Sequence, residues 1–140
     1  MKTVRWFALV APVTLAAAFA PATASATPPM GVESVVISQA TVDGIDYITR
    51  ELTIAPGGST GWHYHDGRTF GVVREGTLTR TMADCTEQVT PVDVGVTEEA
   101  GHVHIGRNLG PVPVKVWVVR IAPAGTPWSV DVPSPGCNIP

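Results

Sequence analysis

Proline and glycine interrupt this chain so often that only short elements of secondary structure fit between them. The 140 residues contain 13 prolines and 14 glycines, which break helices and favour turns. After residue 26, no segment has apolar residues at helical spacing for three turns. These features predict an all-β domain, either a sandwich or a barrel.

The runs between these breaks are rich in valine, isoleucine, threonine and aromatic residues, which favour strands. Asp43-Gly44 and Glu75-Gly76 are predicted turns, because each places an acidic residue and a glycine between two such runs. The predicted strands are 35–37, 47–54, 61–65, 69–74, 77–82, 102–107 and 112–121.

The N-terminal segment 1–26 has the pattern of an export signal. Lys2 and Arg5 give it a positive start, and residues 6–20 are apolar at almost every position. Ala24-Ser25-Ala26 then offers the small residues of a cleavage site. A membrane anchor is the alternative, but the apolar run is shorter than the roughly 20 residues that cross a bilayer. We therefore predict a secreted domain, 27–140, with no stable membrane insertion.

The charge of the expected mature domain restricts its partners. Without Lys2 and Arg5 it has seven basic and twelve acidic residues, a net charge of −5 with histidine neutral. The basic residues are scattered, whereas nucleic acids and anionic membranes attract clusters of lysine and arginine. The sequence argues against a nucleic-acid partner and predicts that the basic residues form a solubilising surface.

The mature domain has two cysteines, Cys85 and Cys137. Exported proteins with an even number of cysteines usually oxidise them, so we predict a disulfide that ties the C-terminal tail, 123–140, to a central loop. Closing a loop of roughly fifty residues stabilises a fold by about 4 kcal/mol. The alternative is that both thiolates are metal ligands.

All four histidines fall in two pairs with the same spacing, His63/His65 and His102/His104. Residues i and i+2 of a strand point to the same face, so each pair places two imidazoles side by side. Two such strands facing each other can surround one ion, and imidazole is a common ligand of transition metals. A single pair of this kind is usually chance, but two pairs with no histidine elsewhere favour a metal site.

Two segments resemble the conserved motifs of the cupin family. Pro56-Gly-Gly-Ser-Thr-Gly-Trp-His-Tyr-His65, closed by Glu75-Gly76, resembles the first motif, at about 56–76. Glu99-Ala-Gly-His-Val-His-Ile-Gly-Arg-Asn108 resembles the second, at about 95–108. The resemblance covers residues 52–124 and implies a double-stranded β-helix, the jelly-roll barrel of cupins.

The resemblance also implies a ligand set for one divalent transition metal, Fe, Mn, Zn, Ni or Cu. His63, His65 and His104 match the family's histidine ligands, whereas the position of its glutamate ligand falls on Thr69. Either a water replaces this ligand, which we favour, or His102 becomes a fourth nitrogen ligand. Without a carboxylate the ion would keep its full charge and attract anionic molecules.

Three further residues are candidates near the site. Asn108 matches a conformational residue of the second motif, Arg68 flanks the expected mouth of the barrel, and Phe70 lies on the strand after the first motif. A small-molecule ligand follows from the open metal positions, while homodimer formation and any catalytic residue are left open. Three functions fit: a metal-dependent dioxygenase, isomerase or lyase, a binding module without turnover, or a metal-free structural cupin.

Overall fold

The computed structural model describes residues 25–139, and the predicted export signal lies almost entirely outside this range. The described residues form ten strands and no helix, so none of them forms a helix that could cross a membrane. The strands are β1 (Met30–Val42), β2 (Ile45–Ser59), β3 (His63–Tyr64), β4 (Arg68–Glu75), β5 (Thr77–Met82), β6 (Glu87–Pro91), β7 (Gly95–Glu98), β8 (His104–Arg107), β9 (Val114–Pro123) and β10 (Val130–Asp131).

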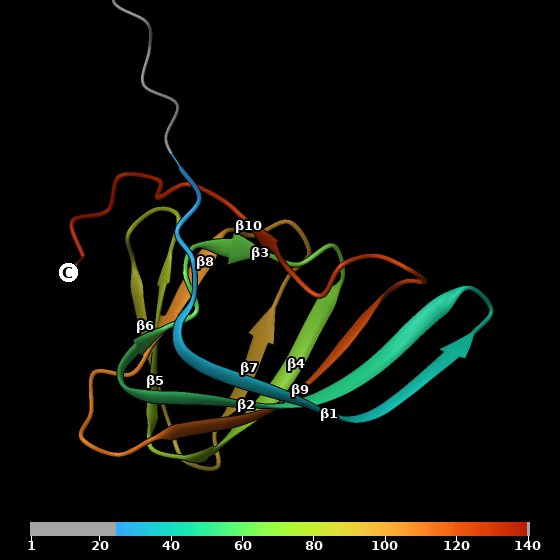
Figure 1. Cartoon of the computed structure of the whole chain (residues 1–140), viewed down its shortest axis with the longest axis horizontal. Coiled ribbons are helices and arrows are strands. Elements are labelled where there is room, and N and C mark those ends of the chain that lie inside the picture. The colour runs from blue at the N-terminus through green and yellow to red at the C-terminus, as the bar shows by residue number, and fades with distance from the viewer. Residues whose placement is uncertain (1–24, 140) are drawn as a thin grey trace, which may run out of the picture.

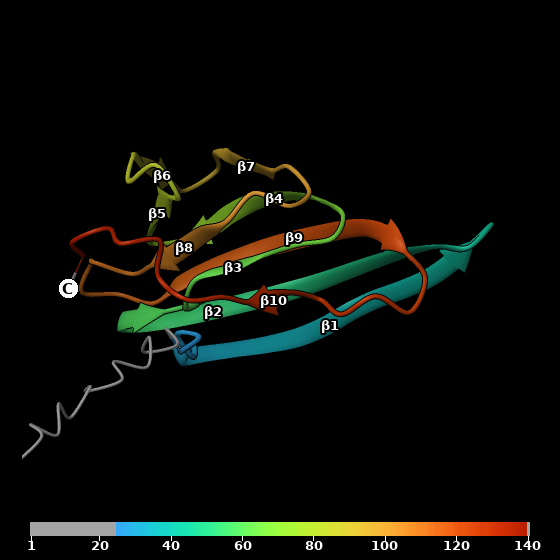
Figure 2. The ribbon, with the colours of Figure 1, turned by 90° about the horizontal axis from the view of Figure 1, so that it is seen from above.

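The strands form two layers that face each other (Figures 1 and 2). One layer has the order β1-β2-β9-β4-β7, and the other has the order β10-β3-β8-β5-β6. Every pairing is antiparallel, and β2 joins β8 at one corner through Ser59 and Arg107. The result is a nearly closed jelly-roll barrel, which confirms the predicted fold.

Each predicted strand overlaps an observed one, but three short strands, β6, β7 and β10, were not predicted. The turn at Asp43-Gly44 is confirmed: both residues have positive φ, 48° and 77°, as a two-residue hairpin turn requires. Gly76 also has positive φ, and a Cβ there would lie 2.6 Å from the backbone oxygen of Pro113. Glycine is therefore required at the β4–β5 turn.

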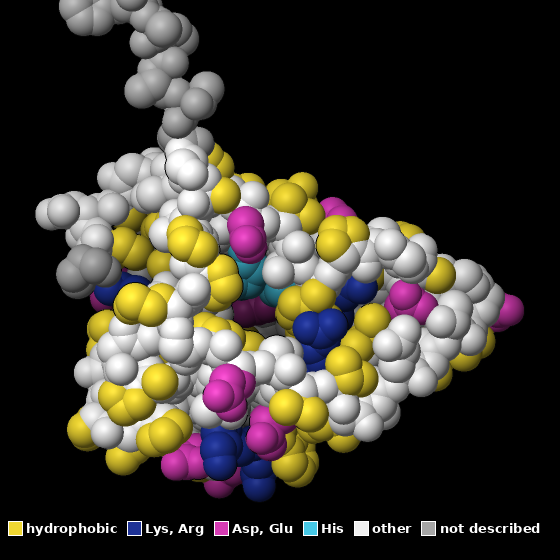
Figure 3. Space-filling view, viewed as in Figure 1, with side chains coloured by type: hydrophobic (Ala, Val, Ile, Leu, Met, Phe, Trp, Pro, Cys, Tyr) yellow, Lys and Arg dark blue, Asp and Glu magenta, His cyan; other side chains and the backbone are white. Residues whose placement is uncertain are grey.

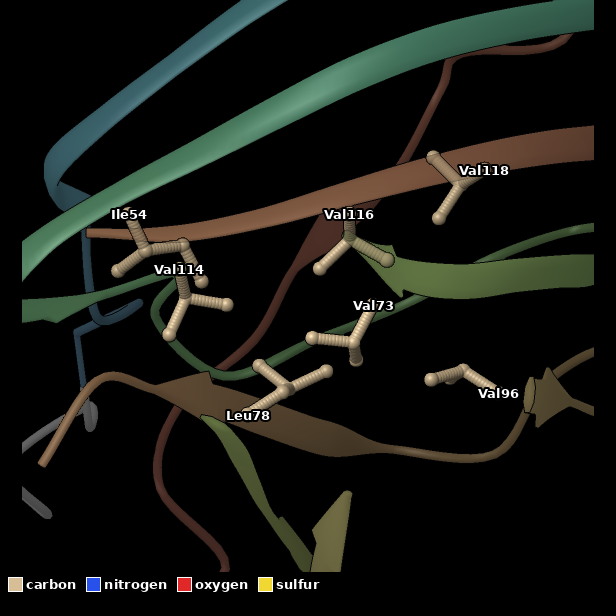
Figure 4. Packing of buried hydrophobic residues seen from close by; sticks show 7 residues of the cluster. All are labelled: Ile54, Val73, Leu78, Val96, Val114, Val116 and Val118. Atoms are coloured by element: carbon tan, nitrogen blue, oxygen red, sulfur yellow. The ribbon is translucent and has the colours of Figure 1, made fainter. Parts of the chain in front are cut away.

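The main core lies between the two layers. Val114, Val116 and Val118 alternate along β9 and point inward, because successive side chains of a strand face opposite ways. They pack against inward residues of β2, β4, β5 and β7 (Figure 4). The cluster consists of Ile54, Val73, Leu78, Val96, Val114, Val116 and Val118.

A disulfide holds the C-terminal tail against the other layer. Cys85 and Cys137 are bonded, with their Cα atoms 5.4 Å apart, which confirms the predicted pairing. The alternative of two thiolate ligands is therefore excluded. Cys137 also packs against Trp62 and Ile105 in a second buried cluster. The tail thus packs against Trp62, which precedes His63, and against Ile105, which follows His104.

The expectation that the basic residues form a solubilising surface is wrong for three arginines. Arg80, Arg107 and Arg120 are only 6%, 5% and 0% exposed. Arg107 pairs with Glu87, and Arg120 donates hydrogen bonds to Thr126 and to the backbone oxygen of Pro127. These arginines fasten loops and strands, because a buried guanidinium needs several acceptors.

Candidate metal centre

Strand register brings three of the four histidines together. His63 of β3 is the direct cross-strand partner of His104 of β8, and their ring centroids lie 4.4 Å apart. His65 follows at i+2, with its ring 4.9 Å from His63 and 5.5 Å from His104. All three are buried, and one nitrogen of each lies within 4.8 Å of the others. This spacing suits ligands of a single ion.

Backbone carbonyl groups orient each ring. Nδ1 of His63 lies 3.0 Å from the oxygen of Gly61, Nδ1 of His65 lies 2.7 Å from that of Trp128, and Nδ1 of His104 lies 2.9 Å from that of His102. Because a carbonyl oxygen only accepts hydrogen bonds, Nδ1 carries the proton in each ring. In the neutral ring Nε2 then keeps a lone pair for a metal.

The structure adds a carboxylate that the sequence analysis missed. Glu98 of β7 places Oε2 3.2 Å from Nε2 of His65 and Oε1 3.2 Å from Nε2 of His104. Glu98 is the cross-strand partner of Thr69, the position where the family glutamate was expected. The carboxylate therefore comes from the neighbouring strand, and the expectation of a site without a carboxylate is wrong.

The arrangement of these atoms fits a metal ion. Oε1 of Glu98 lies 3.2 Å from the buried Nε2 of His104, but the two groups are not aligned for a hydrogen bond. Nε2 therefore has no hydrogen-bond partner among the described residues. Two atoms that each bind one ion at about 2.1 Å lie roughly 3 to 3.4 Å apart. Three imidazoles and one carboxylate are also ligands that Zn, Fe, Mn, Ni and Cu accept.

The pKa shifts of the metal-free site show which groups a proton would occupy. Burial and the neighbouring His104 lower the pKa of His63 to about 4, so its ring is neutral at pH 7. Burial alone would lower the pKa of His104 and raise that of Glu98, but their mutual attraction reverses both directions. Without a metal, His104 therefore takes up a proton more readily than a free histidine does, and Glu98 keeps its negative charge more readily than a free glutamate does.

The other residues predicted near the site lie outside this group. His102 is exposed, and it touches the site only through the backbone oxygen that faces His104. Arg68 is exposed and pairs with Glu99, and Phe70 is 41% exposed. Neither Arg68 nor Phe70 lines the cavity beside the histidines.

Asn108 is fully buried and fastens a loop rather than lining the cavity. Its Nδ2 donates hydrogen bonds to the backbone oxygens of Ile54 and Val112, at 2.9 and 2.7 Å, and its Oδ1 accepts one from the backbone nitrogen of Gly110. Buried backbone groups need such partners. Asn108 therefore holds the chain between β8 and β9 against β2 at Ile54.

A cavity of about 170 Å³ opens beside the histidines and Glu98. Figure 3 shows its opening, where histidine and acidic side chains lie at the bottom of a hollow and basic side chains lie beside it. The inward core residues of β2, β7 and β9 form an apolar wall, and Arg50, Trp128 and Asp131 also line the cavity. The site therefore faces a small, partly enclosed space that suits a small molecule.

Fold, motifs and site together define a cupin. The Cupin_2 family, described as a cupin domain, matches residues 50–120, and the chain belongs to this family. No curated protein matches the sequence.

Solved structures with the same fold share little sequence with this chain. The polyketide cyclase RemF from Streptomyces resistomycificus has a TM-score of 0.61 at 15% identity, covering 84% of this chain and 86% of its own. A protein with a double-stranded β-helix domain from Klebsiella pneumoniae has a TM-score of 0.60 at 19% identity, covering 75% and 84%. A cupin domain from Bordetella pertussis has a TM-score of 0.57 at 22% identity, covering 68% and 95%. At these identities the likeness shows the fold alone.

Proposed function

We propose that this chain is an exported cupin enzyme that holds one divalent transition metal and acts on a small organic molecule in the adjoining cavity. His63, His65, His104 and Glu98 would hold the metal. The observation that carries the proposal is the convergence of three buried histidines and the largely buried Glu98 at one end of a partly enclosed cavity. A metal bound there would polarise an oxygen of the bound molecule.

The shape of the site favours an enzyme over a module that only binds a ligand. A shallow or filled barrel would suit simple binding, whereas here polar side chains line a hollow next to the metal site. Of the described carboxylates that line the cavity, Glu98 would bind the metal, which leaves Asp131. Asp131, the strand partner of His63, is therefore our candidate for proton transfer.

Binding without turnover is the second candidate function. Asp131 is exposed, so solvent competes for the proton that an acid–base group must hold or accept.

Export is supported by the signal-like segment 1–26 and by the disulfide, since disulfides persist in oxidising compartments.

Thermal unfolding with and without a chelator tests the proposal. At pH 7.5, metal at a hundred times its Kd should add about 2.7 kcal/mol to the free energy of unfolding, and the chelator should remove this gain. Imidazoles bind metal only when neutral, and Glu98 raises the pKa of His104 in the metal-free protein against the effect of burial, so the gain should be full well above pH 6.5 and should fall as pH drops through the raised pKa of His104. A Tm that responds to neither the chelator nor added Zn²⁺, Mn²⁺, Fe²⁺, Ni²⁺ or Cu²⁺ would contradict the proposal.

A further inference from the structure

Arg50 is a cation in the cavity wall that has no anionic partner among residues 25–139. It lies in β2 on the inward face that it shares with Leu52 and Ile54, and all three line the cavity. Among residues 25–139, Arg50 takes part in none of the ion pairs that engage other arginines. Among residues 25–139, its guanidinium makes one hydrogen bond, from Nη1 to Oγ of Ser34 at 3.5 Å, and its buried Nε has no partner. Most of its donors are unused.

Arg80 and Arg120, two buried arginines nearby, differ from Arg50 in their terminal nitrogens, which the fold engages; the Nε of each, like that of Arg50, has no partner among residues 25–139. Arg80 also lines the cavity, but it donates to the backbone oxygen of Thr97 and to the side chains of Gln88 and Glu98. The two terminal nitrogens of Arg120 donate hydrogen bonds to Thr126 and Pro127. Arg50 is therefore the guanidinium of the cavity wall that can receive a ligand.

Trp128 connects Arg50 to the metal site. The guanidinium carbon of Arg50 lies 4.4 Å from the centre of the indole, and the ring of His65 lies 6.0 Å from it in an edge-on arrangement. The guanidinium carbon of Arg120 is 5.6 Å from the same indole, which adds a second positive charge. A small molecule beside Trp128 can thus reach both Arg50 and the metal site.

We infer that the cavity takes a small monocarboxylic acid whose carboxylate binds Arg50, an inference that deepens the proposed function and rests on it. The guanidinium offers a charge and several N–H donors, which match a carboxylate. The apolar wall of the cavity suits a hydrocarbon body, and its volume of about 170 Å³ limits the body to a small one. Arg50 is the one guanidinium of the described cavity wall whose terminal donors are largely free, so the wall offers an anchor for one carboxylate.

Calorimetric titration with butyrate and benzoate, beside the neutral amides butyramide and benzamide, tests the inference. The purified protein should bind an acid at least about tenfold more tightly than the amide of the same shape. Arg50→Gln should remove this difference, lowering affinity for the acids at least about tenfold and changing affinity for the amides little, while Arg50→Lys should keep part of it. Arg74→Gln is a matched control, because Arg74 also stacks on a tryptophan, Trp117, but does not line the cavity.

The outcomes separate this inference from the proposed function when the metal content of each sample is measured in parallel. Acid binding that Arg50→Gln leaves unchanged, equal binding of acids and amides, or binding of none of the four would overturn the inference, even in protein that holds metal. Acid binding that depends on Arg50 in protein that takes up no metal would support the carboxylate anchor and overturn the metal proposal instead.

Discussion

Replacing Glu98 by glutamine should weaken the binding of a divalent transition metal at least about tenfold, and up to about 100-fold. The change keeps the shape of the side chain but removes the negative charge that lies 3.2 Å from Nε2 of both His65 and His104. An amide oxygen is a poorer ligand than a carboxylate, and it leaves the full charge of the ion uncompensated. Calorimetric titration with Zn²⁺ at pH 7.5 measures the loss of metal affinity.

The neighbouring glutamate provides the control for this experiment. Glu99 is exposed and pairs with Arg68, so Glu99→Gln removes the same charge one residue further along without touching the histidines. We expect it to bind Zn²⁺ within about twofold of the unmodified protein, since exposed ion pairs contribute little. A Glu98→Gln variant that binds Zn²⁺ as tightly as Glu99→Gln would show that Glu98 is not a ligand.

Removing the disulfide should produce the largest loss of stability. Cys137→Ser opens the bond between residues 52 positions apart, which costs about 4 kcal/mol on the chain-entropy estimate. For a domain of this size, Tm should fall by on the order of 15 °C. The buried cluster of Cys137, Trp62 and Ile105 would also lose the tail that covers it. Thermal unfolding under non-reducing conditions measures the change.

Chemical reduction separates the bond from the substitution. The unmodified protein in a reductant should lose as much Tm as Cys137→Ser does, and Cys85→Ser should match both, because all three remove the same link. Metal content should stay the same in each folded sample, since the bonded cysteines cannot be ligands. A fall in Tm of less than about 3 °C would contradict a stabilising role for the bond.

The histidine cluster is predictable from sequence because it depends on local geometry. The i, i+2 spacing of His63 and His65 places both rings on one face of the chain, whatever the rest of the fold does. The pairing of His63 with His104 requires that β3 and β8 be neighbours in the correct register, an arrangement that the resemblance of the two motifs to those of cupins implies. The resemblance to cupins therefore named the same three histidines that the structure brings together.

Glu98 escaped prediction because its position depends on a long-range register. It lies at the end of β7, a strand of four residues too short to show a clear alternation of polar and apolar residues. Its carboxylate enters the site only because β7 pairs with β4 at Thr69. Thr69 is the cross-strand partner of Glu98. Its buried hydroxyl has no hydrogen-bond partner among residues 25–139.

Arg50 could have been singled out from the sequence by its place in the alternation of β2, although a count of basic residues does not distinguish it. The apolar residues Ile48, Leu52 and Ile54 alternate along β2, and Arg50 stands in the same period. A charged residue on the apolar face of a strand is unusual, because burying it costs free energy unless a partner is present. The alternation itself therefore singles out Arg50, whereas the scattered basic residues on the outer face carry no such signal.

Elemental analysis of the purified protein tests the central claim most directly, with two histidine variants beside it. We expect about one Fe, Mn, Ni, Zn or Cu per chain, unchanged in His102→Ala, whose ring is exposed, and lost in His104→Ala, whose buried Nε2 faces Glu98. Circular dichroism should show the same β content in all three samples. No metal in the unmodified protein after reconstitution with each ion, or equal metal in His104→Ala, would contradict the account.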